Sequence, residues 1–485
     1  MRTACINVFV PTDSMNHNKK FDVLVIIHGG AFMMGSGHST AQSQFLVDRD
    51  LIFVTLNYRL GIFGFLSTQD EEIPGNYGMK DQTLALKWVN ENIASFGGKP
   101  ESITISGLSA GGASVHLHYF SPLSKGLFVR GLSQSGTALD PWVIRRHPLE
   151  RARKLGSLLG CSDESTQEMK KCLKQKPARV ILEKQNYFYG VGEGLARLPL
   201  SPFSPVVETK SKNPFLAEEP FSMLRDGKVL DVPWIVSRCA NEGLFPAVFY
   251  HSDTDKLNND WSKIARYMLD YNYTLSESKQ EDVAKQIKEF YLGPQENINK
   301  ENFKKLIQML TDRLFGIGSE AAAKLQSEAN KSPVYYYYFN YQKGKYKAIR
   351  LFVPTAVGIE GTTYITYIHT DQANLYATLG VSHGEDMLYF YGFPGLKDFS
   401  EEDKKLMNAC QDMLYSYATT GIPSFDGTDK WLPTKHSELT YLNITDASDI
   451  KLETVDSLTP VDFWKSVGLL EYEVYGSKAN TKTEL

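Results

Sequence analysis

A serine flanked by glycines stands between two segments with different secondary-structure signals. Residues 103–106 read Ile-Thr-Ile-Ser, the motif Gly107-Leu108-Ser109-Ala110-Gly111 follows, and residues 113–119 suit a helix. Glycine allows the sharp turn that lifts a side chain clear of the backbone between a strand and a helix. A serine hydroxyl in such a turn becomes a nucleophile when a base lies beside it. The pattern therefore predicts that Ser109 attacks a carbonyl carbon.

A second glycine-rich turn could supply hydrogen-bond donors for the oxyanion of such a reaction. His28-Gly29-Gly30-Ala31-Phe32 directly follows the apolar residues 23–27. Small residues let backbone N–H groups approach a substrate oxygen, and the residue after the nucleophile, here Ala110, donates a further N–H in lipases and esterases. Alone, this segment could equally be a glycine turn after a strand. Together with the serine turn it favours an oxyanion hole.

The nucleophile also needs a base, and histidine is the side chain that titrates near neutral pH. Of the 10 histidines, His383 stands in a polar loop between apolar segments late in the chain, and it is the candidate base. His116 and His118 lie on the helix expected after the serine. We interpret both as structural because they cannot easily fold back to Ser109.

The acid that would orient this histidine is harder to choose, because the chain has 56 acidic residues. Glu242 comes just after the apolar residues 232–236, and ligands bind at the carboxyl ends of strands in open α/β sheets. An exposed loop glutamate is the plainer interpretation of this position. Asp386 is a rival that lies uncomfortably close to His383 in the sequence. The residues alone leave the choice open.

Strand-like and helix-like segments alternate along the chain. Short apolar runs at 22–27 and 51–56 are typical of strands buried on both faces. The spacing of apolar residues predicts helices. Such alternation predicts an α/β fold with a central, mostly parallel sheet flanked by helices. The remaining expected strands are 6–11, 103–106, 128–133, 232–236 and 334–341, and the expected helices include 79–95, 148–159 and 401–419, with helical stretches across 279–305.

Composition narrows the class of protein further. The 485 residues have a net charge of −4, and a negative net charge does not indicate nucleic-acid binding. Hydrophobic residues make up 42% and charged residues 22%, as in an ordinary globular protein. The sequence has no run of about 18 apolar residues, so no transmembrane segment is expected. No repeat or linker divides the chain, and we expect one large domain over residues 1–485.

The cysteines and the chain ends bear on the compartment. Cys161 and Cys172 enclose a short polar loop that suits a local disulfide, although two reduced thiols are the alternative. Asn-X-Ser/Thr triplets, which are possible glycosylation sites, begin at Asn272, Asn330 and Asn443. Each triplet alone is weak evidence of glycosylation. Together they favour the secretory pathway, although the sequence given starts without a signal peptide. The final residues, Lys-Thr-Glu-Leu, are similar to a retrieval signal of the endoplasmic reticulum, and an arbitrary polar end is the alternative.

Several motifs, in the order in which the family carries them, resemble the type-B carboxylesterase and cholinesterase family of α/β-hydrolases. Within that family the sequence is most similar to the insect carboxylesterases. The match runs through most of the chain and is more specific than a single serine motif. Its further segments are Asn57-Tyr58-Arg59-Leu60-Gly61, Gly64-Phe65-Leu66-Ser67, Gly75-Asn76-Tyr77-Gly78-Met79-Lys80-Asp81-Gln82, Phe96-Gly97-Gly98 and Ser133-Gln134-Ser135-Gly136.

The resemblance implies a serine hydrolase that cleaves small carboxylic esters through an acyl-enzyme, without metal or cofactor. It implies Ser109 as nucleophile, Glu242 as acid and His383 as base, in the chain order of α/β-hydrolases. It further implies an oxyanion hole at Gly30, Ala31 and Ala110, a disulfide between Cys161 and Cys172, and a supporting role for a buried Ser135. The family also implies the endoplasmic-reticulum lumen or secretion. It does not indicate the oligomeric state.

Two departures from the family pattern qualify these expectations. Leu108 replaces a glutamate that helps to hold a cationic alcohol group, which argues against a specialist for choline esters. The residues that the family usually carries before the strand at Ile6 are missing from this sequence, so we expect a chain lacking the family's N-terminal segment. A non-catalytic adhesion or binding protein of the same fold is the alternative function, and a lipase or thioesterase is a third.

Overall fold

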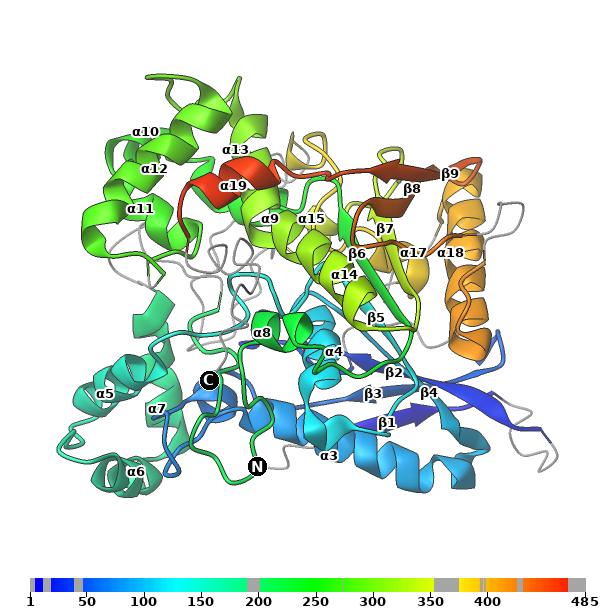
Figure 1. The fold of residues 1–485 in the computed structure, drawn as a ribbon, viewed down its shortest axis with the longest axis horizontal. Coiled ribbons are helices and arrows are strands. Elements are labelled where there is room, and N and C mark those ends of the chain that lie inside the picture. The colour runs from blue at the N-terminus through cyan, green and yellow to red at the C-terminus, as the bar shows by residue number, and fades with distance from the viewer. Residues whose placement is uncertain are drawn as a thin grey trace, which may run out of the picture.

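A single twisted sheet runs through the computed structural model of the protein (Figure 1). The structure describes residues 5–11, 19–38, 47–189, 201–272, 274–352, 375–392, 396, 398–424 and 431–469. Within these residues the sheet has nine strands in the order β1-β3-β2-β4-β5-β6-β7-β8-β9. The strands are β1 Ile6–Phe9, β2 Phe21–Ile27, β3 Leu51–Leu56, β4 Gly98–Leu108, β5 Arg130–Gln134, β6 Trp234–Cys239, β7 Val334–Phe339, β8 Leu439–Asp446 and β9 Asp449–Val455.

The middle of the sheet is parallel and its two edges are antiparallel. Strand β1 pairs with β3 in the antiparallel sense, as β8 does with β9, whereas the pairs between them are parallel. This arrangement confirms the predicted mostly parallel sheet. Parallel strands end at the same edge, so the loops after β4, β5 and β6 come together there.

Helices cover both faces of the sheet, and the strand residues alternate between the two cores. Val23, Val25 and Ile27 of β2 pack into one cluster with α3 (Tyr77–Asn92) and α4 (Ala110–Phe120). Leu24 and Ile26 pack into the other cluster with α17 (Met387–Phe390) and α18 (Glu401–Thr420). Figure 1 shows α18 along one side of the sheet. Burial on both faces explains why these strands are apolar throughout.

The helices of this layered core have the following bounds: α2 Gly61–Phe65, α3 Tyr77–Asn92, α4 Ala110–Phe120, α5 Pro148–Leu158, α6 Thr166–Gln175, α7 Ala178–Gln185, α8 Pro220–Arg225, α9 Leu244–Ala247, α10 Thr254–Asn259, α11 Trp261–Met268, α12 Glu277–Leu292, α13 Phe303–Thr311, α14 Ile317–Ala329, α15 Ala348–Phe352, α17 Met387–Phe390, α18 Glu401–Thr420 and α19 Val461–Ser466. A π-helical turn, Asp312–Gly316, joins α13 to α14. Among the helices that the structure describes, none has both the length and the apolar character needed to cross a bilayer.

The structure confirms the predicted disulfide between Cys161 and Cys172, which closes the loop from the end of α5 into α6. It also refines several boundaries. Strand β6 begins at Trp234, after Pro233, because proline has no N–H to donate to a neighbouring strand. The predicted helical stretch 279–305 is interrupted after Leu292 by Gly293, whose φ of 107° ends α12. The C-terminal Lys-Thr-Glu-Leu lies outside the described residues.

Candidate active site

The serine turn has the strained backbone that the sequence predicted. Strand β4 ends at Leu108, α4 begins at Ala110, and Ser109 between them has φ 61° and ψ −125°. A positive φ at a residue with a Cβ is costly and is seen mainly where a site requires it. The Ser109 N–H donates to Gln134 O of β5 at 2.8 Å, which fixes the turn to the next strand of the sheet.

Glycines on both sides of Ser109 allow this turn to pack against residues 28–32, the predicted oxyanion loop. A Cβ on Gly111 would lie 2.1 Å from Ile27 O, and a Cβ on Gly107 would lie 2.4 Å from the carbonyl carbon of Gly111. Gly29 is equally constrained, since its Cβ would lie 2.5 Å from Leu108 O. The two glycine-rich turns predicted from the sequence are therefore in direct contact.

The oxyanion loop itself follows β2 and turns sharply. Gly30, Ala31 and Phe32 have φ values of 109°, 55° and 60°. Within the described ranges, no protein acceptor takes the N–H groups of Gly30, Ala31 or Ala110. The Ala110 N–H is free because it belongs to the first turn of α4. Three unoccupied donors next to Ser109 suit an oxyanion hole, although that role stays a prediction.

The structure assigns a hydrogen-bonded carboxylate to the candidate base. His383 Nδ1 lies 2.6 Å from Glu242 Oε2, and both side chains are buried. Because a carboxylate only accepts, the Nδ1 atom carries the proton, and Nε2 is left as the basic nitrogen. The rings of Phe315 and Phe245 flank the imidazole at centroid distances of 4.8 and 5.6 Å. This arrangement favours Glu242 over the plainer interpretation of an exposed loop residue.

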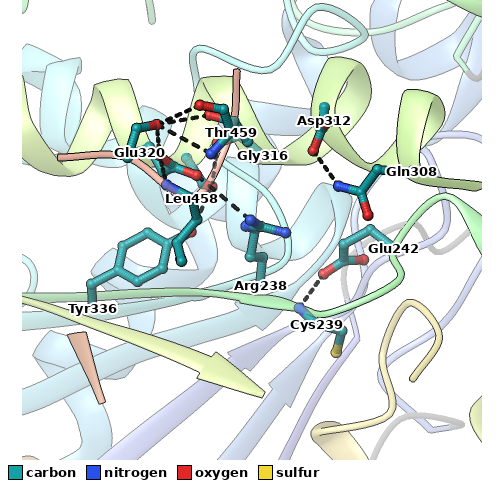
Figure 2. A network of polar contacts seen from close by, with 12 residues as sticks. Arg238, Cys239, Glu242, Gln308, Asp312, Gly316, Glu320, Tyr336, Leu458 and Thr459 are labelled. Atoms are coloured by element: carbon teal, nitrogen blue, oxygen red, sulfur yellow. Dashed lines mark hydrogen bonds and ion pairs between the residues drawn. The ribbon is translucent and has the colours of Figure 1, made fainter. Parts of the chain in front are cut away.

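Further donors hold the glutamate in place. Oε1 of Glu242 accepts from Ser135 Oγ at 2.5 Å and from Cys239 N at 2.6 Å. Figure 2 shows the contact with Cys239 at the end of β6. Ser135 follows β5, so donors from two neighbouring strands converge on one carboxylate oxygen. The supporting position expected for Ser135 is thus visible as a contact.

A buried ion pair lies behind the acid and anchors its strand (Figure 2). The guanidinium of Arg238, the residue before Cys239, lies 3.6 Å from Glu320 Oε1 on α14, and 4.9 Å above the Tyr338 ring. Glu320 Oε2 also accepts from Leu458 N at 3.0 Å. Nearby, burial raises the pKa of Asp312 to about 6, and its carboxyl accepts from Gln308 Nε2 and Tyr291 Oη. The Arg238–Glu320 pair thus ties β6 to α14, which directly follows the π-helical turn that carries Phe315.

The rival acid, Asp386, accepts hydrogen bonds from residues other than His383. Its carboxylate accepts from Gln134 Nε2 at 3.0 Å and from Tyr337 Oη at 2.7 Å, and it makes no hydrogen bond with His383. Three other histidines are unsuited to act as the catalytic base. Burial lowers the pKa of His28 to about 4, and lowers the pKa of both His116 and His118 to about 3. These rings remain neutral and structural at neutral pH.

The structure does not join all three predicted catalytic residues. Ser109 Oγ and His383 are both described, and no hydrogen bond links them in the described part of the chain. The serine follows β4 and the glutamate follows β6, at the common carboxyl edge of the sheet. Catalytic hydrogen bonds are often long without substrate. The Ser109–His383 contact therefore stays a prediction.

Sequence reasoning missed the aromatic rings that pack on His383. Phe315 belongs to the π-helical turn between α13 and α14, and such turns often occur at functional sites. Their backbone register has no recognisable sequence signal, which explains the omission. No group of three metal-ligating side chains occurs in the residues that the structure describes.

The central sheet is parallel, a strained serine follows β4, and a glutamate after β6 bonds a histidine from a later loop. This combination defines the α/β-hydrolase class. Residues 5–464 match the carboxylesterase family model. The chain therefore belongs to the carboxylesterase family.

Individual relatives agree with this assignment. Venom carboxylesterase-6 of Apis mellifera is 47% identical over 344 residues, covering 70% of this chain and 60% of that protein. A carboxylic ester hydrolase of Bombus ignitus is 36% identical over 479 residues, covering 98% and 80%. The crystal structure of juvenile hormone esterase from Manduca sexta, with OTFP covalently attached, has a TM-score of 0.77 at 23% identity, over 95% of this chain and 83% of that one. That similarity supports the fold.

Proposed function

We propose that the chain hydrolyses carboxylic esters of small molecules by two-step acyl transfer. Ser109 is the nucleophile, His383 the base and Glu242 the acid that orients it. The observation that carries the proposal is the 2.6 Å contact between His383 Nδ1 and the buried Glu242 carboxylate. Family membership and the names of the relatives support ester hydrolysis.

In the first step, His383 Nε2 takes the proton of Ser109 Oγ as this oxygen forms a bond to the ester carbonyl carbon. The carbonyl oxygen becomes an oxyanion, which accepts from the N–H groups of Gly30, Ala31 and Ala110. The bond to the alkoxy oxygen then breaks, and the imidazolium protonates the leaving alcohol. Glu242 stabilises the imidazolium and fixes its tautomer.

In the second step, water replaces the alcohol. His383 Nε2 takes a proton from water, whose oxygen bonds to the acyl carbon of the Ser109 ester. The second oxyanion forms on the same donors. The bond between Ser109 Oγ and the acyl carbon then breaks, His383 returns the proton to the serine, and the acid leaves.

The decisive variant is Ser109→Ala, assayed with a short aryl ester in water. We expect turnover to fall by about 10⁵-fold or more, because loss of a triad nucleophile leaves only binding and the oxyanion donors. The control is the thermal midpoint, which should stay close to that of the wild type. Retained turnover in the purified variant would refute the assignment, and an inactive wild type would favour the adhesion alternative.

Two broader expectations belong to the same proposal. The continuous sheet supports a single domain over residues 1–485. The disulfide and the venom relative support the secretory pathway. Leu108 precedes the nucleophile and packs partly buried against the core. We therefore propose neutral esters in preference to choline esters.

A further inference from the structure

Asp386 is a fully buried carboxylate that the proposed mechanism does not use. It lies in the tight turn that carries His383, where Glu385 N donates to Ser382 O at 3.1 Å and Met387 N donates to Gly384 O at 3.2 Å. Its own Oδ1 accepts from Met387 N at 2.9 Å and so caps α17. Burying a carboxylate without compensation is costly, so its partners indicate why it is there.

The partners of Asp386 point to an ionised carboxylate. Oδ2 accepts from Gln134 Nε2 and Tyr337 Oη, and Cys239 Sγ lies 3.7 Å from Oδ1. Tyr337 Oη in turn accepts from Gln134 Nε2 at 2.9 Å, so its own proton is free for Asp386. Since the amide and backbone N–H groups only donate, both oxygens are used as acceptors. Burial and the nearby Glu242 charge raise the pKa of Asp386, and the hydrogen bonds from Tyr337 and Gln134 oppose that rise.

The same carboxylate touches residues that hold the other two catalytic groups. Gln134 O accepts the backbone N–H of Ser109 at 2.8 Å. Cys239 N donates to the Glu242 carboxylate at 2.6 Å. Asp386 therefore joins the histidine turn to the strand that fixes the nucleophile and to the strand that fixes the acid.

We propose that Asp386 is a positioning residue of the esterase site, which locks the His383 turn against β5 and β7 and stabilises the protonated imidazole through its negative charge. This role rests on the proposed function. Asp386 does not replace Glu242, because among the described carboxylates it is Glu242 that bonds the imidazole. The imidazolium exists only after the serine proton has moved, so a nearby anion stabilises the transition state more than the ground state.

Other charged and titratable groups around this site must be kept unchanged in any test. Lys347 Nζ lies 3.2 Å from Glu385 Oε1 and offsets that carboxylate. Burial raises the pKa of Glu385 to about 7. In the described part of the chain, the groups that face the His383–Asp386 turn from its own loop and from the elements packed against it are Glu242, Cys239, Tyr337, Glu385, Lys347, Tyr391, Cys410 and, beyond Glu242, Asp140.

The test compares the pH profile of kcat/KM for the wild type and Asp386→Asn, with a short aryl ester. Removing the negative charge leaves the imidazolium less stable. We therefore expect the acidic limb to move to lower pH by about one pH unit, and the plateau to fall about 10-fold. Labelling by an organophosphate should still reach one adduct per folded molecule, because Ser109 is intact.

Two further variants make the result decisive. Asp386→Ser also removes the charge, and serine can still cap α17, so it serves if Asp386→Asn does not fold. Asp403→Asn removes another fully buried carboxylate, on α18, which accepts from Tyr389 Oη of α17 and from the backbone N–H of Ser400 just before α18. We expect its profile to match that of the wild type.

A wild-type profile in folded Asp386→Asn overturns the inference. A lower plateau with an unmoved acidic limb also overturns it, because packing alone would then account for the loss. Failure of both Asp386 variants to fold does the same, since it would make Asp386 a folding residue. An inactive wild type instead contradicts the proposed ester hydrolysis.

Discussion

The two sides of the candidate site are built in different ways. The nucleophile side consists of short glycine-rich turns, in which backbone atoms pack within van der Waals distance and few side chains take part. The acid–base side consists of buried side chains from distant segments, held by hydrogen bonds to Glu242 and Asp386. Substitution of the turn glycines on the first side should therefore cost stability, whereas loss of the buried polar contacts on the second side should cost rate.

After loss of the Ser109 hydroxyl itself, the largest effect is expected on the acid–base side. Glu242→Gln keeps the shape of the side chain but removes the charge that stabilises the imidazolium. Its amide also puts an NH2 donor in place of one acceptor oxygen, either the one that bonds His383 or the one that Ser135 and Cys239 share. We expect kcat to fall by about 10³- to 10⁴-fold with the Ser109 hydroxyl still present.

Ser135→Ala is the matched control for that variant. It removes one donor to Glu242 Oε1, while Cys239 N still donates to the same atom. A loss of about 10-fold is expected, in line with the net strength of one hydrogen bond to a charged group. Equal losses in Glu242→Gln and Ser135→Ala would show that the glutamate charge is not what matters.

The next effect is expected on the nucleophile side. Gly111→Ala places a Cβ 2.1 Å from Ile27 O, so the backbone of β2 or α4 must shift. We expect a loss of about 3 kcal/mol in the free energy of unfolding, measured by urea denaturation. The comparison is Gly126→Ala, where nothing lies within 4 Å of the added Cβ and the substitution meets only the positive φ of 78°. It should lose about 1 kcal/mol, from backbone strain alone.

A smaller, pH-dependent effect tests the helix that carries the serine turn. Burial lowers the pKa of both His116 and His118 on α4 to about 3, against 6.5 for an unperturbed histidine. The unfolded chain thus binds more protons between pH 6.5 and 3, and stability falls as the pH falls through this window. From pH 7 to 5.5 the two residues should cost about 2 kcal/mol together.

Urea denaturation at several pH values checks this slope. His118→Gln should lessen the stability lost between pH 7 and pH 5.5 by about 1 kcal/mol, the share of one buried histidine. An equally steep slope in His118→Gln would mean that other groups control the acid sensitivity.

The same division explains what the sequence could predict. The strand, serine turn and helix around Ser109 follow from local composition, because glycine spacing and apolar runs act over a few residues. The sheet class followed from the alternation of such segments and is confirmed. Local signals also placed β2 and β3 closely, since strands buried on both faces are continuous apolar runs.

The acid–base side could not be predicted in the same way. From the residues alone, Glu242 and Asp386 remained rivals for His383, and only the family resemblance favoured Glu242. The structure distinguishes them, because hydrogen bonds between β5, β6 and the His383 turn depend on how distant segments pack. The Phe315 contact arises from a π-helical turn, which follows from tertiary packing and was not predicted.

The most direct test of the central claim is to locate the covalent adduct of an organophosphate by peptide mass spectrometry. The account predicts one adduct per folded molecule, on Ser109, formed rapidly in the wild type and at least 100-fold more slowly in His383→Ala. An adduct on another residue, or equal labelling rates with and without the imidazole, would contradict a serine activated by the His383–Glu242 pair.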